Sequence, residues 1–373
     1  MRNRYSARST QFRKPIIKDR YLFLLAFIVS HAVYSQDSTK TLTWSGYVEA
    51  YYSYDFNRPA DGNKAPFIYS FNRHNEVNVN LGFLKAAYQS QTLRANLALM
   101  TGTYANTNLS NEPGVLKNIL EGNAGVRLSQ KAELWIDAGI FTSHIGFESA
   151  IGKDSWNLTR SLVADNTPYY ESGVKISYTT SNGQWFVSGM ILNGWQRMQR
   201  LEGNSLPSFG TQLTFRPADG LLFNSSTFIG TDSPDSARLM RYFHNSYAIV
   251  QFNRRLGLTL GFDYGIQQSA PHSEGYDDWW APIAIARLTI TDRLSMDVRA
   301  EYYADETGII IATGTPNGFK TTGLSANLDY KITDNALWRL EFRNFNSKDA
   351  IFTRESEAVK SNSFITTSLA IGF

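Results

Sequence analysis

The sequence predicts an all-β fold, a closed antiparallel transmembrane β-barrel of about 16 strands, and three observations predict it. After Thr41 the apolar residues recur at every second position, which is the period of a strand with one apolar face. The connections between these segments alternate between short and long. Aromatic residues make up 14% of the 373 residues, yet the mean hydropathy is only −0.30, which is typical of a barrel with apolar and polar strand faces.

The first 35 residues are expected to be a secretory signal peptide. Seven Lys and Arg residues, with Asp19 as the only acid, precede a nine-residue apolar run at 21–29. That run is shorter than the roughly 20 apolar residues of a transmembrane helix, which argues against the alternative of a membrane anchor. Val33 and Ser35 suit cleavage before Gln36. We therefore expect a signal peptide at 1–35 and one barrel domain at 36–373.

Charge and cysteine content exclude several other classes of protein. Removing the signal takes seven bases from 36 and one acid from 33, so the mature chain has 29 Lys and Arg against 32 Asp and Glu, a net charge of −3. The pI of 8.8 comes from the discarded segment and does not predict nucleic-acid binding. The chain has no cysteine, which excludes disulfides, thiolate metal sites and a lipid-anchoring cysteine.

The opening segment, 42–56, shows the alternation clearly. Its even positions, beginning with Leu42 and Trp44, are apolar or small, and its odd positions are mostly polar. Because successive side chains of a strand point to opposite faces, one face suits lipid and the other suits water. Sixteen segments of this kind are predicted strands: 42–56, 74–88, 92–102, 119–128, 132–141, 169–179, 184–194, 209–216, 221–230, 242–252, 256–266, 279–290, 294–303, 320–331, 336–345 and 362–373.

The connections alternate strictly, which a soluble sandwich or propeller has no reason to maintain. The short ones are 89–91, 129–131, 180–183, 217–220, 253–255, 291–293 and 332–335, and several carry the Asn, Asp or Gly that hairpin turns require. The long ones are 57–73, 103–118, 142–168, 195–208, 231–241, 267–278, 304–319 and 346–361. We expect the short turns to be periplasmic and the long loops to be outside the cell, and an even strand number to close the sheet.

The third long loop, 142–168, is about ten residues longer than its neighbours and carries both charges and apolar residues. Loops of this length are usually functional or disordered, and the apolar residues argue against disorder. We expect the loop to fold into the barrel and to narrow a pore, presenting its charges to water; the alternative is a cap over the rim. The predicted constriction residues are His144, Glu148, Lys153, Asp154, Arg160 and Asp165.

Charged residues fall on the polar face of the predicted strands. A charge in a membrane-spanning element is costly unless it faces water or another charge, so these residues predict a water-filled lumen, a bracing network of salt bridges along its wall, or both. Their mixed signs predict no strong ion selectivity. The predicted pore-lining residues are Glu133, Asp137, Arg299, Glu301, Arg339, Glu341 and Arg343.

Two stretches resemble a known family. The block GIFTSHIGFES (139–149) and the block RSLVADNTPYYESG (160–173) resemble the OmpL-like putative β-barrel porin family of Bacteroidota outer membranes, and the preceding strand ELWIDAG (133–139) and the opening strand WSGYVEAYYSYDFNRP (44–59) fit as well. The resemblance implies an outer-membrane barrel with a passive-porin role and brings no catalytic residues. The terminal SLAIGF resembles the signal by which barrel-assembly machinery accepts outer-membrane proteins.

Enzyme chemistry is not predicted. None of His74, His144, His244 and His272 lies in a G-x-S-x-G context, and no P-loop, dinucleotide fingerprint or Cys/His metal spacing is present in the sequence. His144 lies near Ser143 in a stretch that is more typical of loop folding than of catalysis. We expect no catalytic site, no cofactor and no metal site.

The sequence therefore predicts an outer-membrane porin, a diffusion channel for small hydrophilic solutes, exported through the periplasm. Its expected partners are outer-membrane lipid, those solutes and the barrel-assembly machinery, and no nucleic acid. A homo-oligomer is left open, because no interface is legible in the sequence. The alternative from another class is a plugged barrel that serves as a surface receptor or adhesin, which conductance in a lipid bilayer would distinguish.

Overall fold

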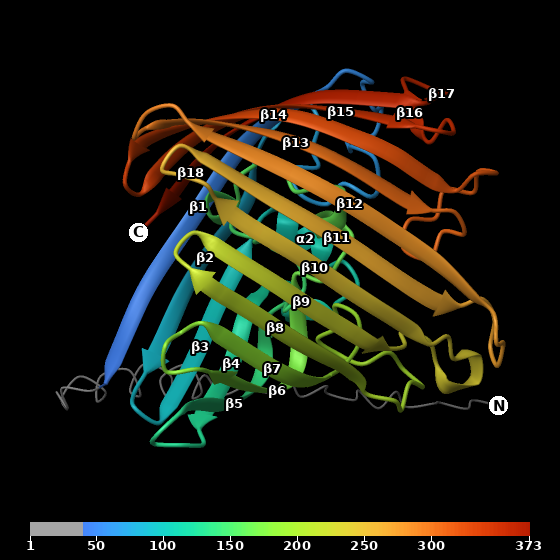
Figure 1. Cartoon of the computed structure of the whole chain (residues 1–373). Coiled ribbons are helices and arrows are strands. Elements are labelled where there is room, and N and C mark those ends of the chain that lie inside the picture. Colours follow the sequence, from blue (N-terminus) through green and yellow to red (C-terminus); the bar gives the residue numbers. More distant parts are fainter. Residues whose placement is uncertain (1–39) are drawn as a thin grey trace, which may run out of the picture. The chain divides into compact units, whose positions relative to one another are not determined.

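The computed structural model describes residues 40–373, so the expected signal peptide lies outside the described residues. Within this part of the chain, sixteen antiparallel strands form a closed barrel (Figure 1), which confirms the predicted fold class. Sequential strands are neighbours, and the barrel closes where the first strand pairs with the last. The barrel strands are β1 (Thr41–Asp55), β2 (Val77–Gln89), β3 (Leu93–Thr101), β4 (Ile119–Arg127), β5 (Glu133–Thr142), β6 (Tyr170–Thr179), β7 (Trp185–Leu192), β8 (Ser208–Ala218), β9 (Leu221–Gly230), β10 (Arg241–Gln251), β11 (Leu256–Gln268), β12 (Tyr276–Thr289), β13 (Leu294–Asp305), β14 (Phe319–Thr333), β15 (Ala336–Ser347) and β18 (Ser361–Gly372).

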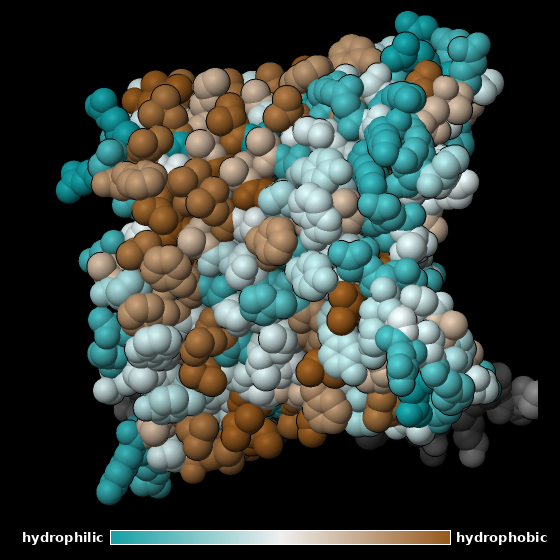
Figure 2. Space-filling model, turned by 45° about the vertical axis from the view of Figure 1, so that its right-hand side comes forward, coloured by the Kyte–Doolittle hydropathy of each residue, from teal (hydrophilic) through white to brown (hydrophobic). Residues whose placement is uncertain are grey.

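The period-two pattern separates an outer wall from a lumen. In β13, Met296 and Val298 are 40% and 49% exposed, whereas Asp297 and Arg299 are 0% and 2% exposed. Apolar side chains thus cover the outer wall and polar ones turn inward, as a barrel in hydrocarbon requires. Figure 2 shows apolar residues gathered on one side of the outer wall and hydrophilic residues along its two rims.

The short helices of the described residues lie in the long connections, which leave the strands at the end of the barrel opposite the short turns (Figure 1). No helix in the range 40–373 has the length and apolar character to cross a membrane. We call the connections after β1, β3 and β5 loop 1 (56–76), loop 2 (102–118) and loop 3 (143–169). The elements in the connections are α2 (Thr103–Asn108), the 3-10 helices η1 (Gly114–Asn118), η2 (Gly152–Asp154) and η3 (Asp235–Ala237), the helical turn α3 (Leu162–Asp165), and the hairpin of β16 (Phe352–Arg354) and β17 (Glu357–Val359).

Apolar side chains of these loops pack against lumen-facing apolar side chains of the wall. Leu162 of loop 3 and Phe67 of loop 1 belong to one buried cluster with Ile283 of β12. Tyr169 of loop 3 and Tyr104 of loop 2 stack edge to face with ring centres 5.6 Å apart, in a second cluster. The apolar residues that the sequence places in loop 3 therefore serve as its packing surface.

Candidate pore

Three arginines on the lumen face bind the main chain of loop 3. We call Arg299 of β13 with Arg339 and Arg343 of β15 the arginine clamp; each is at most 2% exposed. Arg339 donates through Nη1 to the carbonyl of Gly152 at 2.8 Å and through Nη2 to that of Ser155 at 3.0 Å. A guanidinium has five N–H donors, so one side chain can hold several carbonyl groups at once.

The other two arginines hold the next part of the loop. Arg299 Nη1 donates to the carbonyl of Thr159 at 2.7 Å, and Arg343 Nη1 donates to that of Arg160 at 2.6 Å. Each guanidinium also faces a carboxylate: Arg299 Nη2 lies 2.9 Å from Glu341 Oε1, and Arg343 Nη2 lies 2.5 Å from Glu301 Oε1. Buried charges are tolerated when they are paired and hydrogen-bonded; both guanidinium groups are paired and donate through their Nη groups, whereas the Nε of each has no hydrogen-bond partner among the described residues.

Carboxylates on the same strands accept hydrogen bonds from the N–H groups of the loop. Glu341 Oε2 accepts from the N–H of Thr159 at 2.6 Å, and Glu301 Oε2 accepts from that of Leu162 at 2.6 Å. Five of the seven residues predicted to line the pore thus contact loop 3 and brace it. The salt-bridge network expected along the wall exists, and the loop forms part of it.

The remaining two predicted pore-lining residues lie on β5, away from the clamp. Asp137 is 4% exposed and pairs with Arg94 of β3. Glu133 lies at the short-turn end, where its carboxylate pairs with Arg127 at 2.6 Å.

Four of the six predicted constriction residues make hydrogen bonds that hold loop 3 in its fold. His144 Nε2 lies 2.8 Å from the carbonyl of Thr227 in β9. Glu148 accepts hydrogen bonds from the N–H and the hydroxyl of Ser161. These contacts fasten the beginning of the loop to the wall and to its own return segment.

Arg160 and Asp165 are 1% and 5% exposed, and the side chain of Glu148 is 2% exposed, which corrects the expectation that these three charges face water. Arg160 donates to the carbonyls of Ser149 at 2.6 Å and Leu158 at 2.8 Å, so its guanidinium folds the loop on itself. Asp165 Oδ1 accepts from the hydroxyl of Ser70 in loop 1 at 3.0 Å. Spacing along the chain could not reveal this, because the loop supplies the partners of its own charges.

Lys153 and Asp154 are the two predicted constriction residues that are exposed to solvent. Lys153 borders a pocket of about 280 Å³ beside the turns that join β12 to β13 and β14 to β15. Trp156 borders a pocket of about 790 Å³ beside the turns that join β6 to β7 and β8 to β9. The middle of loop 3 therefore reaches the short-turn end of the barrel.

The wall formed by β2 to β7 carries a second set of charges, and most of them are partly exposed. Lys85 Nζ of β2 lies 2.7 Å from Glu121 Oε2 of β4. Arg94 pairs with Asp137 across β4, where Gly125 leaves the space: a Cβ there would lie 2.2 Å from Asp137 Oδ1. No hydrogen bond from these charged side chains to loop 3 occurs in the described part of the chain.

The sequence reading missed Lys85 because of a β-bulge. The pairing of β1 with β2 shifts between Glu49 and Ala50, and Asn80 and Leu81, which are consecutive, are both 0% exposed. A bulge inserts one residue and exchanges the faces that follow it. The lumen-facing positions of β2 therefore change from even to odd residue numbers before Lys85. A strict period-two reading assigns Lys85 to the lipid-facing side, which is wrong.

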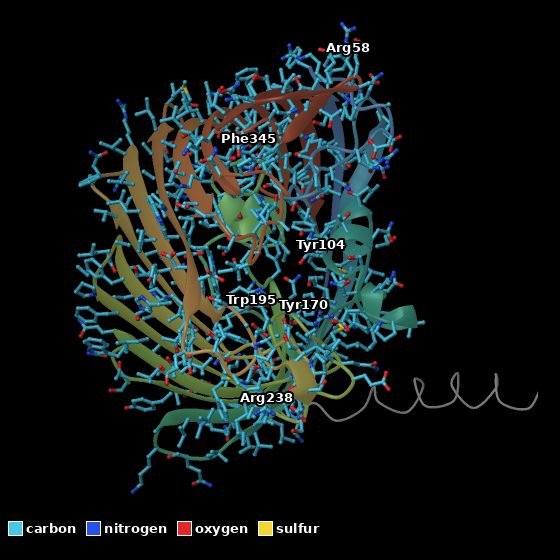
Figure 3. The ribbon with its side chains drawn as sticks, turned by 90° about the vertical axis from the view of Figure 1, so that its right-hand side faces the viewer. Arg58, Tyr104, Tyr170, Trp195, Arg238 and Phe345 are labelled. Carbon is cyan, nitrogen blue, oxygen red and sulfur yellow. The ribbon has the colours of Figure 1, made fainter. Side chains whose placement is uncertain are left out.

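At the long-loop end, a pocket of about 460 Å³ is lined by loops 1 to 3 and by the connections after β7, β9 and β13. Trp195 and Tyr170 border it, and Figure 3 shows both inside the ring of strands, near Tyr104. The same pocket is bordered by Arg197, Arg241 and Asp232, so this opening beside loop 3 is lined by charged groups. Within 40–373 no three His, Asp or Glu residues are grouped to hold a metal ion.

Replacing Asp165 by Asn is expected to raise the heat stability of the barrel at pH 8 and to leave it nearly unchanged at pH 4. Burial raises the pKa of Asp165 to about 7, and the guanidinium of Arg343 opposes this. Because this pKa lies above the ordinary value, stability from the protonated group is complete below about pH 4 and is lost as the pH rises through 7. An amide avoids that loss, roughly 2–4 kcal/mol, and still accepts from Ser70. Unfolding midpoints of the variant and the unmodified barrel at pH 8 and pH 4 measure this difference in stability. An equal change at both pH values would contradict the raised pKa of Asp165.

In a comparison with known families, the family described as "Putative beta-barrel porin-2, OmpL-like" matches residues 41–373. None of the curated proteins compared with the chain matches it.

Solved structures with the same fold are outer-membrane channels and porins of low sequence identity. The channel DcaP of Acinetobacter baumannii has a TM-score of 0.60 at 10% identity, over 91% of this chain and 99% of that one. The anion-selective porin from Comamonas acidovorans has a TM-score of 0.59 at 12% identity, over 90% and 100%. OmpT of Vibrio cholerae, in a trimer form, has a TM-score of 0.57 at 9% identity, over 90% and 100%. At these identities the likeness shows the fold.

Proposed function

The chain belongs to the OmpL-like putative β-barrel porin-2 family of outer-membrane barrels, and we propose that it is a water-filled channel for passive diffusion of small hydrophilic solutes. Transport of this kind needs a polar path across the membrane and no chemistry at a catalytic group. We therefore propose no enzymatic activity and no cofactor.

The observation that supports this proposal most is the asymmetry of the lumen. Loop 3 is hydrogen-bonded to side chains of β10, β13, β14 and β15. The opposite wall, β2 to β7, keeps partly exposed charges such as Lys85, Glu121 and Lys175. Charged side chains at membrane depth are retained when they face water, so we place the path between loop 3 and this wall.

In this proposal loop 3 narrows the path by occupying the other half of the lumen. His144, Glu148, Arg160 and Asp165 hold the loop in place, and Lys153 with Asp154 face the solvent near the short-turn end. We further propose that residues 1–35 act as a signal peptide, that the terminal Phe373 takes part in recognition by the barrel-assembly machinery, and that the barrel forms a homo-oligomer, as the similar OmpT does in its trimer form.

Conductance of the purified, folded barrel in a planar lipid bilayer tests the function. A diffusion channel gives discrete current steps whose size grows with salt concentration, whereas the same detergent without protein gives none. Swelling of liposomes in sugars of increasing size then measures the width of the path. A folded, inserted barrel that carries no current and admits no sugar would favour the plugged receptor instead.

A further inference from the structure

We propose that the path along the β2–β7 wall favours anions over cations, and that Lys175 of β6 is the residue that determines this preference. The inference rests on the diffusion channel proposed above and adds its charge selectivity. It follows from the charges in the middle of that wall; outside this section Arg127 pairs with Glu133 near the short turns, and Glu171 of β6 is 0% exposed.

Two of the three bases in the middle of the wall are neutralised by their neighbours. Lys85 pairs with Glu121, and Arg94 pairs with Asp137. Arg94 also lies against the ring of Trp135, because its guanidinium carbon is 4.3 Å from the ring centre. An ion pair of this kind presents little net charge to a passing solute, since the fields of its two members nearly cancel at a distance.

Lys175 is the third base, and no carboxylate lies within 4 Å of its ammonium group in the described part of the chain. Its Nζ lies 4.5 Å from the ring centre of Phe141, a cation–π contact that leaves the charge in place. Both carboxylate oxygens of the nearest acid, Asp137, are taken by Arg94. The middle of the wall thus carries three positive charges against two negative ones.

The position of Lys175 places this charge at the level where loop 3 enters the lumen. Lys175 stands opposite Asp137 in one register row, and the row continues through Met190 to Gly210. At Gly210 a Cβ would lie only 2.7 Å from His144 Nε2, so loop 3 meets the wall in this row. Phe141, the partner of Lys175, is the last buried residue before the loop. A charge beside a narrow passage acts on each ion that passes.

The opening at the long-loop end carries charge of the same sign. Arg197 and Arg241 border it, and neither has an ion pair among the described residues. Arg241 is held over Trp195 at 5.1 Å and bonded to Gln267 at 3.0 Å. The acids of this opening are Asp165 and Asp232, and burial raises the pKa of both carboxyls. Burial thus disfavours negative charge at this opening, whereas its two guanidinium groups stay charged, and this balance favours anions.

Reversal potentials in a potassium chloride gradient test the inference. The unmodified channel should reverse toward the chloride equilibrium potential. A unit positive charge about 4 Å from an ion in a water-like dielectric raises the local population of an anion about fivefold and lowers that of a cation about fivefold, so Lys175→Gln should lower the chloride-to-potassium permeability ratio by up to about 25-fold. Lys175→Glu should lower it further and make the channel favour cations, whereas Lys175→Arg should keep the original ratio.

A matched control is Lys331→Gln, because Lys331 lies near the short turn after β14 and pairs with Asp334 at 2.7 Å; its permeability ratio should not change. Channels that conduct but show no anion preference would overturn the inference and leave the diffusion channel standing. So would Lys175→Gln and Lys175→Glu variants that assemble normally and keep the original ratio. A folded barrel that conducts nothing would refute the channel itself.

Discussion

Arg339→Ala should release the middle of loop 3 and lower the stability of the folded barrel by about 3–5 kcal/mol, the usual cost of removing one partner from a buried charged network. Arg339 is 0% exposed. Its guanidinium bonds to both carboxylate oxygens of Asp329, at 2.7 and 2.9 Å, and to the carbonyls of Gly152 and Ser155. The substitution takes the closer of two guanidinium partners from the buried carboxylate of Asp329, whose other partner, Arg287, lies 3.2 Å away, and it removes the bonds that hold η2 near the short-turn end.

The temperature at which the barrel unfolds, read from its change in mobility on a gel, measures the loss of stability. Single-channel recordings of Arg339→Ala should show larger and noisier currents. Arg127→Ala is the matched control, because Arg127 pairs with Glu133 at the rim, where the carboxylate side chain is 51% exposed. Exposed pairs of this kind contribute about 0–1 kcal/mol. Equal losses in the two variants would mean that Arg339 does not hold the loop.

The strands could be predicted from the sequence because their pattern is local. Alternation within 294–303, for example, depends only on neighbours in the chain, and β13 extends from Leu294 to Asp305. The boundaries of strands were predicted less accurately: the predicted strand 74–88 begins at Val77. Residues before it, such as Asn75, adopt a positive φ, which is turn geometry that a reading by hydrophobic period does not detect.

The candidate site was predicted only in part, because its contacts join residues far apart in the chain. Arg339 and Glu341 stood out as charges on one strand face, yet their partners in loop 3 are more than 180 positions away. A loop carbonyl has no sequence signature, so a reading by residue type overlooks it as a partner. Lys175 lies in the predicted strand 169–179, but its lack of a counter-ion becomes apparent only after Arg94 and Asp137 are seen to pair across β4.

Deleting residues 150–160 should raise single-channel conductance several-fold while the barrel still assembles. The ends of this segment are neighbours: Ser161 donates its N–H to Glu148 at 3.1 Å, so joining Ser149 to Ser161 needs little rearrangement. The clamp keeps its carboxylates when the segment is gone, because Arg299 pairs with Glu341, Arg339 with Asp329 and Arg343 with Glu301. Water can replace the lost carbonyl partners in a lumen that is now wider.

The control for that deletion is a shortening of the connection between β11 and β12, where residues 270–272 are exposed. It removes loop length without touching the lumen, so its conductance should equal that of the unmodified channel. If the 150–160 deletion assembles and conducts no more than this control, loop 3 does not limit the flow of ions, and the path between it and β2–β7 is not the narrowest part of the channel. A rise confined to the 150–160 deletion places the limiting section at loop 3, because no other part of the lumen wall has changed.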